Sequence, residues 1–301
     1  MRGVNPHKGF TAIQRGSIHA DNQPHVVTMC RRTSREVRWL TPIGHAASVD
    51  PSKPNAARVY NYLLGGKDNY TVDQRVAERM LAVAPDTKTT AWFSRKFLLK
   101  AVEDAAEAGI RQFIDIGAGI PISPNVHEIA QKIDPTARVV MIDYDPVVHV
   151  HTHALLSGAS GVTSILGDIR RTDEIIEKTR SKGHIDFDQP VAILIVGVLH
   201  FVMDDEHPAD IIARLRDEMA PGSILAFTHG SVDTQPAFVE RSTGDTDGSS
   251  AQVRFRTPEM VATYLDGFEV VEPGLVPVQE WLDDDLPRTK LVILGGVGRK
   301  P

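Results

Sequence analysis

Three aspartates stand at the ends of apolar stretches that have the character of buried strands. Asp115 lies in "FIDIG", Asp143 in "VVMIDYDP" and Asp168 in "SILGD". Because the carboxyl ends of neighbouring parallel strands meet at one edge of a sheet, we expect the three carboxylates to face a common site. A single acid at a strand end is weak support, since acids often end strands or cap helices. Three in succession indicate a site that binds hydroxyl, amino or cationic groups.

A glycine turn follows the first of these strands, in the stretch "DIGAGIPIS". A dinucleotide fingerprint would need a third glycine at position 122, which is an isoleucine, and Pro121 removes a backbone donor. A pyrophosphate held about 4 Å from Asp115 would also be repelled by roughly 4 kcal/mol at a surface-like dielectric. The turn therefore favours a cationic ligand. S-adenosylmethionine (SAM) carries an ammonium group and a sulfonium in place of phosphates.

Each acid suits one part of SAM. Asp115 and the small residues of the turn suit the methionine end. Asp143, which lies 24 residues beyond Gly119, can accept hydrogen bonds from both ribose hydroxyls. Asp168, beside the backbone N–H of Ile169, can read the amino group and a ring nitrogen of adenine. The predicted cofactor contacts in this part of the chain are Asp115, Gly117, Gly119, Asp143, Tyr144, Asp168 and Ile169.

The elements that must position these residues alternate between helix and strand signals. Residues 89–109 place Phe93 and Phe97 on one helical face and end at a glycine. Ser123 followed by Pro124 indicates the N-cap and the first residue of the next helix. The continuous apolar runs of the strands suit a mostly parallel sheet that helices cover on both faces. Seven strands are expected, at 111–117, 137–146, 162–168, 191–202, 220–229, 268–278 and 290–298.

Charge is divided unevenly along the chain. Residues 1–47 hold seven Lys and Arg against two acids, so the 33 basic and 39 acidic residues of the whole chain leave 26 and 37 for the remainder. Nucleic-acid binding usually needs a basic face, because phosphate neutralisation supplies most of the affinity. The acidic body therefore argues against a nucleic-acid partner and favours a small-molecule substrate.

Cysteine usage and hydropathy indicate the cellular compartment in which the protein works. Cys30 is the single cysteine, so the chain can form no internal disulfide and offers no cysteine cluster for a metal. The longest apolar stretch, at 191–199, is far shorter than the roughly 18 residues that span a bilayer. No signal-peptide pattern opens the chain. These features predict a cytoplasmic protein with no membrane partner and no metal.

Three parts are expected along the chain. Residues 1–47 form a basic extension without sustained periodicity, for which we predict mobility and assign no function. Residues 48–88 form a helical cap before the sheet, and residues 89–301 form the domain that contains the sheet. Within that domain residues 230–257 are irregular, and we expect them to lie over the pocket as a substrate-side insertion.

The cap contains the stretch "ARVYNYLLGGKDNY" at 57–70, which we expect to fold over the mouth of the cofactor site. Arg58 could pair with the methionine carboxylate of SAM, and Tyr60 or Tyr62 could close the pocket. The alternative is that Tyr60 and its apolar neighbours only dock a helix, which the paired glycines then end.

Two histidines stand where substrate chemistry would occur. His200 follows the apolar run 191–199 of the fourth expected strand and His229 ends the fifth, at the carboxyl edge where open α/β sheets bind ligands. A neutral imidazole there could deprotonate a hydroxyl or amine nucleophile. The alternative for each is a histidine that packs or hydrogen-bonds at a strand end. Asp204 and Asp205, just beyond, are interpreted as solvated loop acids.

Taken together, "DIGAGIP", "VVMIDYDP", "LGDIR" and "GVLHFVMDD" resemble the successive motifs of class I SAM-dependent methyltransferases. With "LLGGKDNY" upstream, residues 48 to 300 resemble the bacterial "S-adenosyl methyltransferase" family. The resemblance implies a seven-stranded Rossmann-like sheet in a class I methyltransferase domain, with SAM as cofactor. By motif position it assigns Asp115, Gly117 and Gly119 to the methionine end, Asp143 to the ribose and Asp168 to the adenine. Pro121 departs from the usual glycine-rich form of the turn.

The predicted function is methyl transfer from SAM to a small-molecule acceptor by in-line displacement. The departing thioether is neutral, so the enzyme mainly needs alignment, exclusion of water and a base where the nucleophile carries a proton. Two alternatives stay open at this point. One is a SAM-binding regulatory protein without catalysis, and the other is an NAD-linked oxidoreductase, which Asp115 and the missing third glycine oppose.

Overall fold

The computed structural model describes residues 37–39, 47–49, 52–156, 158–246, 252–282 and 285–301. The chain divides into two units, residues 1–48 and 49–301. At the end of the first unit, strand β1 (Val37–Trp39) pairs with β2 (Ala47–Val49) in a two-stranded sheet. The mobility expected for residues 1–47 concerns positions that lie mostly outside the described residues.

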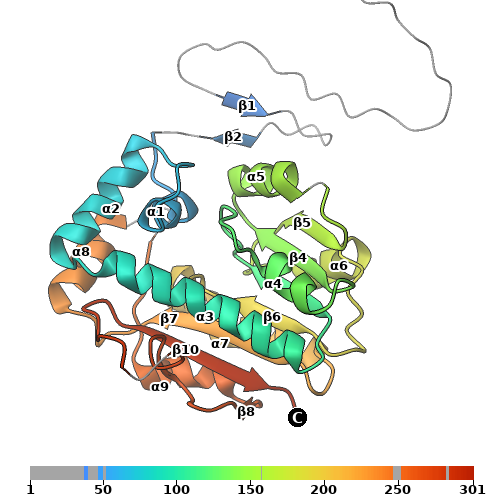
Figure 1. The fold of residues 1–301 in the computed structure, drawn as a ribbon. Coiled ribbons are helices and arrows are strands. Elements are labelled where there is room, and N and C mark those ends of the chain that lie inside the picture. Colours follow the sequence, from blue (N-terminus) through green and yellow to red (C-terminus); the bar gives the residue numbers. More distant parts are fainter. Residues whose placement is uncertain (1–36, 40–46, 50–51, 157, 247–251, 283–284) are drawn as a thin grey trace, which may run out of the picture. The chain divides into compact units, whose positions relative to one another are not determined.

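The second unit is built on one eight-stranded, mostly parallel sheet (Figure 1). Its strands follow the order β5-β4-β3-β6-β7-β10-β8, and β9 also pairs with β10. Strands β3 to β7 are parallel to one another, whereas β10 runs antiparallel to its neighbours β7, β8 and β9. The bounds are β3 (Gln112–Ile116), β4 (Arg138–Asp143), β5 (Val162–Leu166), β6 (Ala192–Ile195), β7 (Ile224–Gly230), β8 (Glu269–Val270), β9 (Val276–Pro277) and β10 (Ile293–Arg299).

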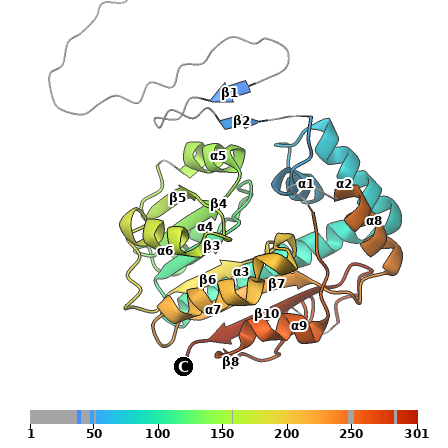
Figure 2. The ribbon, with the colours of Figure 1, turned by 180° about the vertical axis from the view of Figure 1, so that it is seen from behind.

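Helices cover both faces of this sheet, as the apolar strands require. Helices α3 (Thr87–Glu107) and α4 (Val126–Ile133) pack on one face, which is toward the viewer in Figure 1. The opposite face, toward the viewer in Figure 2, carries α6 (Thr172–Ser181), α7 (Pro208–Glu218) and α9 (Pro258–Ala262). Helix α5 (Pro146–Leu156) packs beside β4 and β5.

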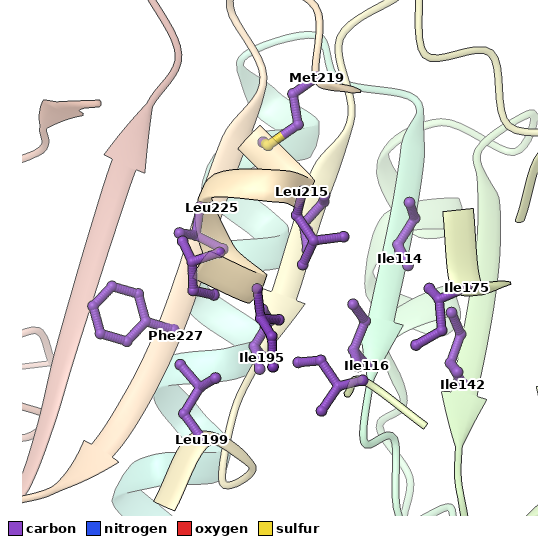
Figure 3. Packing of buried hydrophobic residues seen from close by; sticks show 14 of the residues in the cluster. Ile114, Ile116, Ile142, Ile175, Ile195, Leu199, Leu215, Met219, Leu225 and Phe227 are labelled. Carbon is purple, nitrogen blue, oxygen red and sulfur yellow. The ribbon is translucent and has the colours of Figure 1, made fainter. Parts of the chain in front are cut away.

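Successive residues of the central strands enter opposite layers of the core, as the two-residue period of a strand dictates. In β3, Phe113 packs in the layer of α3 and α4, while Ile114 and Ile116 pack in the layer of α6 and α7. Leu194 and Ile195 divide in the same way in β6. Figure 3 shows the second layer, in which side chains from the strands meet those of α6 and α7.

The sixth expected strand, at 268–278, is divided in two. Between β8 and β9, Pro273 offers no N–H to a ladder, and Gly274 has a φ of +93°. Both short pieces still pair with β10. The seven expected strands therefore become eight.

The helix after the glycine turn begins later than expected. Helix α4 starts at Val126, with Asn125 as its N-cap, so the assignment of Ser123 and Pro124 to the start of this helix was wrong. The Asn125 N–H donates to Glu128 Oε2 at 2.5 Å, which completes a capping box. The reciprocal bonds of Asn125 and Glu128 define the helix start better than a proline does.

Two helices form the cap, α1 (Ala56–Leu63) and α2 (Thr71–Val83). The buried carboxylate of Asp73 joins their starts. It accepts hydrogen bonds from the backbone N–H of Asn55 at 2.9 Å and of Tyr70 at 2.8 Å. It also accepts one from Arg58 Nε at 2.9 Å, which makes a buried ion pair. The packing of α1 against α2 therefore depends on one satisfied acid.

The cap meets the insertion on the same side of the molecule. Helix α8 (Pro236–Thr246) packs against α2, and the two lie side by side in Figures 1 and 2. Buried side chains from both segments meet in one apolar cluster, which contains Ala84, Phe238 and Leu291. Residues 48–88 and 230–257 thus share a hydrophobic contact.

Helix α3 runs through position 88 without a break, so no helix end separates the cap from the sheet at that point. The boundary drawn there stays a prediction. Among the described residues, no helix combines the length and the apolar character that crossing a membrane requires.

The core predicts a large cost for truncation at Phe227, whose fully buried ring packs edge-on against Tyr264 at 5.6 Å between ring centroids. We expect Phe227→Ala to lower the free energy of unfolding by about 3 to 5 kcal/mol. In a unit of this size that corresponds to a loss of about 6 °C or more in melting temperature. Val270→Ala, at a side chain that is 53% exposed, is the control and should change stability by less than about 0.5 kcal/mol. Equal losses in the two variants would contradict the assignment of the core.

Candidate active site

The three aspartates of the sequence analysis come together at the carboxyl edge of three adjacent strands. Asp115 is the last but one residue of β3, Asp143 ends β4, and Asp168 follows β5 by two residues. All three line one cavity of about 270 Å³. The other predicted cofactor residues in its wall are Tyr60, Gly117, Gly119, Tyr144 and Ile169.

The glycine turn needs its glycines for two different reasons. Gly117 has a φ of +77°, and a Cβ there would lie 2.1 Å from Cγ2 of Val198. Gly119 has a φ of +65°, with open space where a Cβ would stand. The N–H groups of Gly117 and Ala118 both donate to the carbonyl of Ile142, at 2.7 and 3.0 Å. The turn therefore lies against the end of β4.

Asp143 holds this turn in place. Its Oδ2 accepts from the Gly119 N–H at 2.9 Å, and its Oδ1 accepts from the Asp145 N–H at 2.9 Å. Burial raises the pKa of Asp143 to about 6, although these hydrogen bonds favour the charged form. A carboxylate has about four acceptor positions, so Asp143 keeps capacity for further donors.

Asp115 is the least satisfied of the three acids. Its Oδ2 is buried and accepts no hydrogen bond from any described residue. Burial raises the pKa of Asp115 to about 7, Arg95 acts in the opposite direction, and Asp143 adds to the rise. An unpartnered carboxylate oxygen at the wall of a cavity fits a ligand that brings a positively charged donor. The ammonium group of SAM is such a donor.

Arg95 is a site residue that the sequence analysis missed. It projects from α3, is buried in the cavity wall, and donates from Nη2 to the carbonyls of Ile122 at 2.6 Å and Pro124 at 2.7 Å. A signal was present, because Ala91, Leu98 and Val102 form a second apolar stripe on this helix that Arg95 interrupts.

Arg58, expected to bind the methionine carboxylate, has other partners. Its guanidinium pairs with Asp73 and donates from Nη2 to the carbonyl of Lys53 at 2.7 Å. It is not among the described residues that line the cavity. Tyr60 does line it and donates its hydroxyl to the carbonyl of Ala91 at 3.0 Å. Burial raises the pKa of Tyr60 to about 12, so this side chain is neutral near pH 7.

Asp168, assigned to the adenine, is engaged by a neighbour. Arg170 binds both of its carboxylate oxygens, with Nε at 2.9 Å from Oδ1 and Nη2 at 2.9 Å from Oδ2. The same guanidinium donates from Nη1 to Glu206 at 3.1 Å. Arg170 also lines the cavity, beside the buried Ile169. An adenine ring at this end would therefore contact an ion pair and not an isolated carboxylate.

The two histidines have different surroundings. His200 lines the cavity on the 3₁₀ turn Leu199–Phe201, and its buried Nδ1 has no hydrogen-bond partner among the described residues. Burial, with His229 and Arg256 nearby, lowers the pKa of His200 to about 3. Its ring is therefore neutral at pH 7 and able to accept a hydrogen bond.

His229 lies inside β7 and outside the set of described cavity residues. Nδ1 is 2.9 Å from the carbonyl of Gly230, and Nε2 is 2.8 Å from Nη1 of Arg256. Since the guanidinium can only donate, Nε2 accepts and Nδ1 carries the proton. Both ring nitrogens are occupied, which supports the structural alternative for this histidine.

Arg256 was also missed, and nothing in the surrounding "QVRFRTPE" predicted it. Its buried guanidinium binds Asp204 Oδ1 at 2.7 Å from Nη2, the carbonyl of Val202 at 2.8 Å, and His229. Asp204, whose side chain is 47% exposed, in turn pairs with Arg254 at 2.9 Å, so this solvated loop acid also carries two ion pairs. These contacts join the end of the insertion to the loop that carries His200.

The remainder of the cavity wall is mainly apolar. It is formed by the cap, by α8 and the residues after it, and by the approach to β10. Its apolar side chains include Val76, Met80, Phe238, Phe255, Leu291 and Ile293. The cavity therefore has an acidic end at the sheet edge and an apolar end beneath the cap and the insertion.

Comparison with known proteins gives a consistent result. The family model described as S-adenosyl methyltransferase matches residues 43–301. A DUF574 family protein from Streptomyces avermitilis shares 34% identity with a TM-score of 0.78, over 82% of this chain and 98% of its own. A candidate methyltransferase from Thermobifida fusca shares 36% identity with a TM-score of 0.76, over 83% of this chain and 96% of its own. No curated protein matches the chain.

The raised pKa of Asp115 predicts a pH-dependent stability. Between about pH 4 and 7 the folded protein binds more protons at this group than the unfolded chain does, so this contribution to stability falls as the pH rises through that window. Asp115→Asn removes the charge. We compare the melting temperature of the variant with that of wild type, both without ligand. The difference, variant minus wild type, should be more positive at pH 8 than at pH 5 by about 3 °C or more.

The control for this measurement is Asp104→Asn, at an exposed acid paired with Lys100 on α3. Its difference from wild type should be the same at both pH values. A difference for Asp115→Asn that did not change with pH would show that Asp115 is not a buried carboxyl group in solution.

Proposed function

The chain belongs to the S-adenosyl methyltransferase family, and we propose that it transfers a methyl group from SAM to a small-molecule acceptor. The dependence on SAM follows from the family. The assignment of roles to residues is the proposal. The observation that supports it best is the buried Oδ2 of Asp115, which has no hydrogen-bond partner in the part of the chain that the structure describes and stands at the glycine turn beside Arg95.

Asp115 and Arg95 together suit the methionine end of SAM, which carries one positive and one negative group. The ammonium group would donate to Asp115 Oδ2, and the carboxylate would lie against the guanidinium of Arg95. Arg95 is already oriented by two backbone carbonyls, so little side-chain entropy would be lost on binding. In this proposal Arg95 takes the role that the sequence analysis gave to Arg58.

Asp143 and Asp168 would hold the nucleoside. Asp143 has acceptor positions left for the ribose hydroxyls, beside the exposed ring of Tyr144. Asp168 with Arg170, and the backbone of Ile169, would contact the adenine. Their order along the sheet edge, β3, β4 and β5, matches the order of the methionine, ribose and adenine portions.

SAM supplies an electrophilic methyl group on a sulfonium whose departure leaves a neutral thioether. The protein's contribution is to align the acceptor and to exclude water. A group with a pKa near 3 accepts a hydrogen bond readily but holds a proton poorly. We therefore assign His200 the role of orienting the acceptor's O–H or N–H through Nδ1, with the proton released as the new bond forms.

The NAD-linked alternative loses support on three counts. The family model is that of a methyltransferase. The acid at Asp115 is buried within the cavity wall, where a pyrophosphate would be repelled. The turn lacks its third glycine.

Methyl transfer is tested directly with SAM labelled in its methyl group. The protein is incubated with this cofactor and a cell extract from which macromolecules have been removed. We expect label in one or a few small molecules, formed together with an equal amount of S-adenosylhomocysteine (SAH) and absent when the protein is omitted. Binding of SAH without any labelled product would favour the alternative of a SAM-binding regulator.

The ribose contact of Asp143 is tested by comparing SAH with its 2′-deoxy analogue. A charge-assisted hydrogen bond contributes about 1.5 to 3 kcal/mol, so wild-type protein should bind the analogue at least roughly tenfold more weakly. Asp143→Ala should bind SAH at least roughly tenfold more weakly and discriminate between the two ligands by less than about threefold. Calorimetry gives both affinities.

The analogue is needed because Asp143 also holds the glycine turn, so the alanine variant should melt at a lower temperature whether or not the ribose is bound there. The ratio of the affinities of one variant for SAH and for its 2′-deoxy analogue does not depend on that loss of stability. Undiminished discrimination in Asp143→Ala would remove Asp143 from the ribose site.

A further inference from the structure

Packed aromatic and aliphatic side chains form the wall at the apolar end of the cavity. Phe238 of α8 and Phe255 pack at right angles, with 6.4 Å between ring centroids and an interplanar angle of 89°. Gly230, at the end of β7, allows this arrangement, because a Cβ there would stand 3.0 Å from the ring of Phe255. Met80 of α2 packs against the same cluster. The cap, the insertion and the strand end therefore form one continuous apolar surface.

Two threonine hydroxyls in this part of the wall already have partners. The hydroxyl of Thr87 donates to the carbonyl of Ala84 at 2.7 Å, and that of Thr90 to the carbonyl of Asp86 at 3.3 Å. Among the described lining residues the charged side chain on this side is Arg241 of α8, which has an interaction of its own. A sugar or another hydrophilic acceptor would lose its hydration here without gaining partners, at a cost of roughly 1 to 3 kcal/mol for each polar group.

One histidine of the cavity wall has a ring nitrogen with no partner among the described residues. The atom is Nδ1 of His200, which is buried, on a ring that lies 4.4 Å from the ring of Phe201 between centroids and is tilted from it by 54°. SAM would occupy the acidic end. A molecule in the apolar end could therefore present one polar group to His200 and the methyl group, while the rest of it lay against aliphatic and aromatic side chains.

We propose that the methyl acceptor is a neutral, largely apolar small molecule of aromatic character, whose single hydroxyl or amino group reaches His200 from the pocket between α2, α8 and Phe255. This inference rests on the proposed function and gives it a substrate class. In the reaction, a lone pair of the acceptor's oxygen or nitrogen forms a bond to the methyl carbon as the carbon–sulfur bond breaks. The electron pair of that bond goes to sulfur, which gives SAH, and the acceptor's proton leaves by way of His200 to water.

Binding of 1-naphthol to protein saturated with SAH tests this inference without knowledge of the natural acceptor. We expect one saturable site by calorimetry, and no measurable binding of uridine, a polar molecule used as the comparison. Met80→Glu places a charge in the apolar wall and Met80→Trp fills the pocket, so each should weaken 1-naphthol binding at least tenfold. The matched control is Met260→Glu, at a side chain on α9 that is 43% exposed and lies outside the described cavity wall, and it should bind as wild type does.

The role of His200 is tested by replacing 1-naphthol with naphthalene. Wild-type protein should prefer 1-naphthol by about two- to tenfold, the range of a single neutral hydrogen bond, and His200→Ala should lose that preference. Unchanged 1-naphthol affinity in both Met80 variants, or tighter binding of uridine than of 1-naphthol, would overturn the proposed substrate class. SAH affinity is measured separately in every variant and should not change. Failure of wild-type protein to bind SAH would count against the proposed function itself, a result distinct from the loss of the apolar site.

Discussion

The carboxylate of Asp143 is the contact on which the geometry of the site depends. It accepts one hydrogen bond from the glycine turn after β3 and one from the turn after β4, and so joins the ends of two neighbouring strands. The backbone of Gly117 also bonds to β4 directly. Because the turn cannot move away from β4, Asp115 one strand earlier is kept beside Asp143, although burial disfavours the charged form of both.

That arrangement reduces the stability of the protein without ligand. Asp143 and burial raise the pKa of Asp115, and Arg95 offsets this rise only in part. A bound cation supplies the missing positive charge, so ligand binding and folding are thermodynamically coupled through these acids. The same acids explain why a phosphate ligand is disfavoured, since it would add negative charge where the protein already has an excess. In the proposed function, the repulsion between these acids would make the site selective for a cationic cofactor.

Sequence patterns predicted the sheet and the acids because both depend on local composition. Continuous apolar runs identify strands that are buried on both faces, and an acid at the end of each run identifies the edge where ligands bind. The family resemblance gave the same answer and was confirmed. The division of the sixth strand was missed because the apolar run at 268–278 outweighed the signal of Pro273 and Gly274.

In the candidate site, the residues that sequence reasoning misplaced or missed are arginines, and the reason is physical. A long guanidinium can reach any of several acids and carbonyls, and the choice is made by tertiary packing. Arg58 lies next to residues that suggested a ligand contact, yet it forms an ion pair with Asp73 on the following helix. Arg95 and Arg256 donate to backbone carbonyls of residues that are far away in the sequence, and no local sequence pattern predicts such partners.

Arg256 holds the loop that carries His200 through contacts that do not involve helix α8. Its guanidinium reaches Val202, Asp204 and His229, while its backbone N–H donates to Gly230 at 3.1 Å. The N–H of Arg254 also donates to the carbonyl of His200, at 2.7 Å. The end of the insertion is therefore fastened to the loop that carries His200, independently of α8, which forms the apolar wall. If the proposed acceptor pocket is correct, side chains of α8 and α2 could change with the shape of the acceptor without moving His200, because contacts from Arg254 and Arg256 hold its loop.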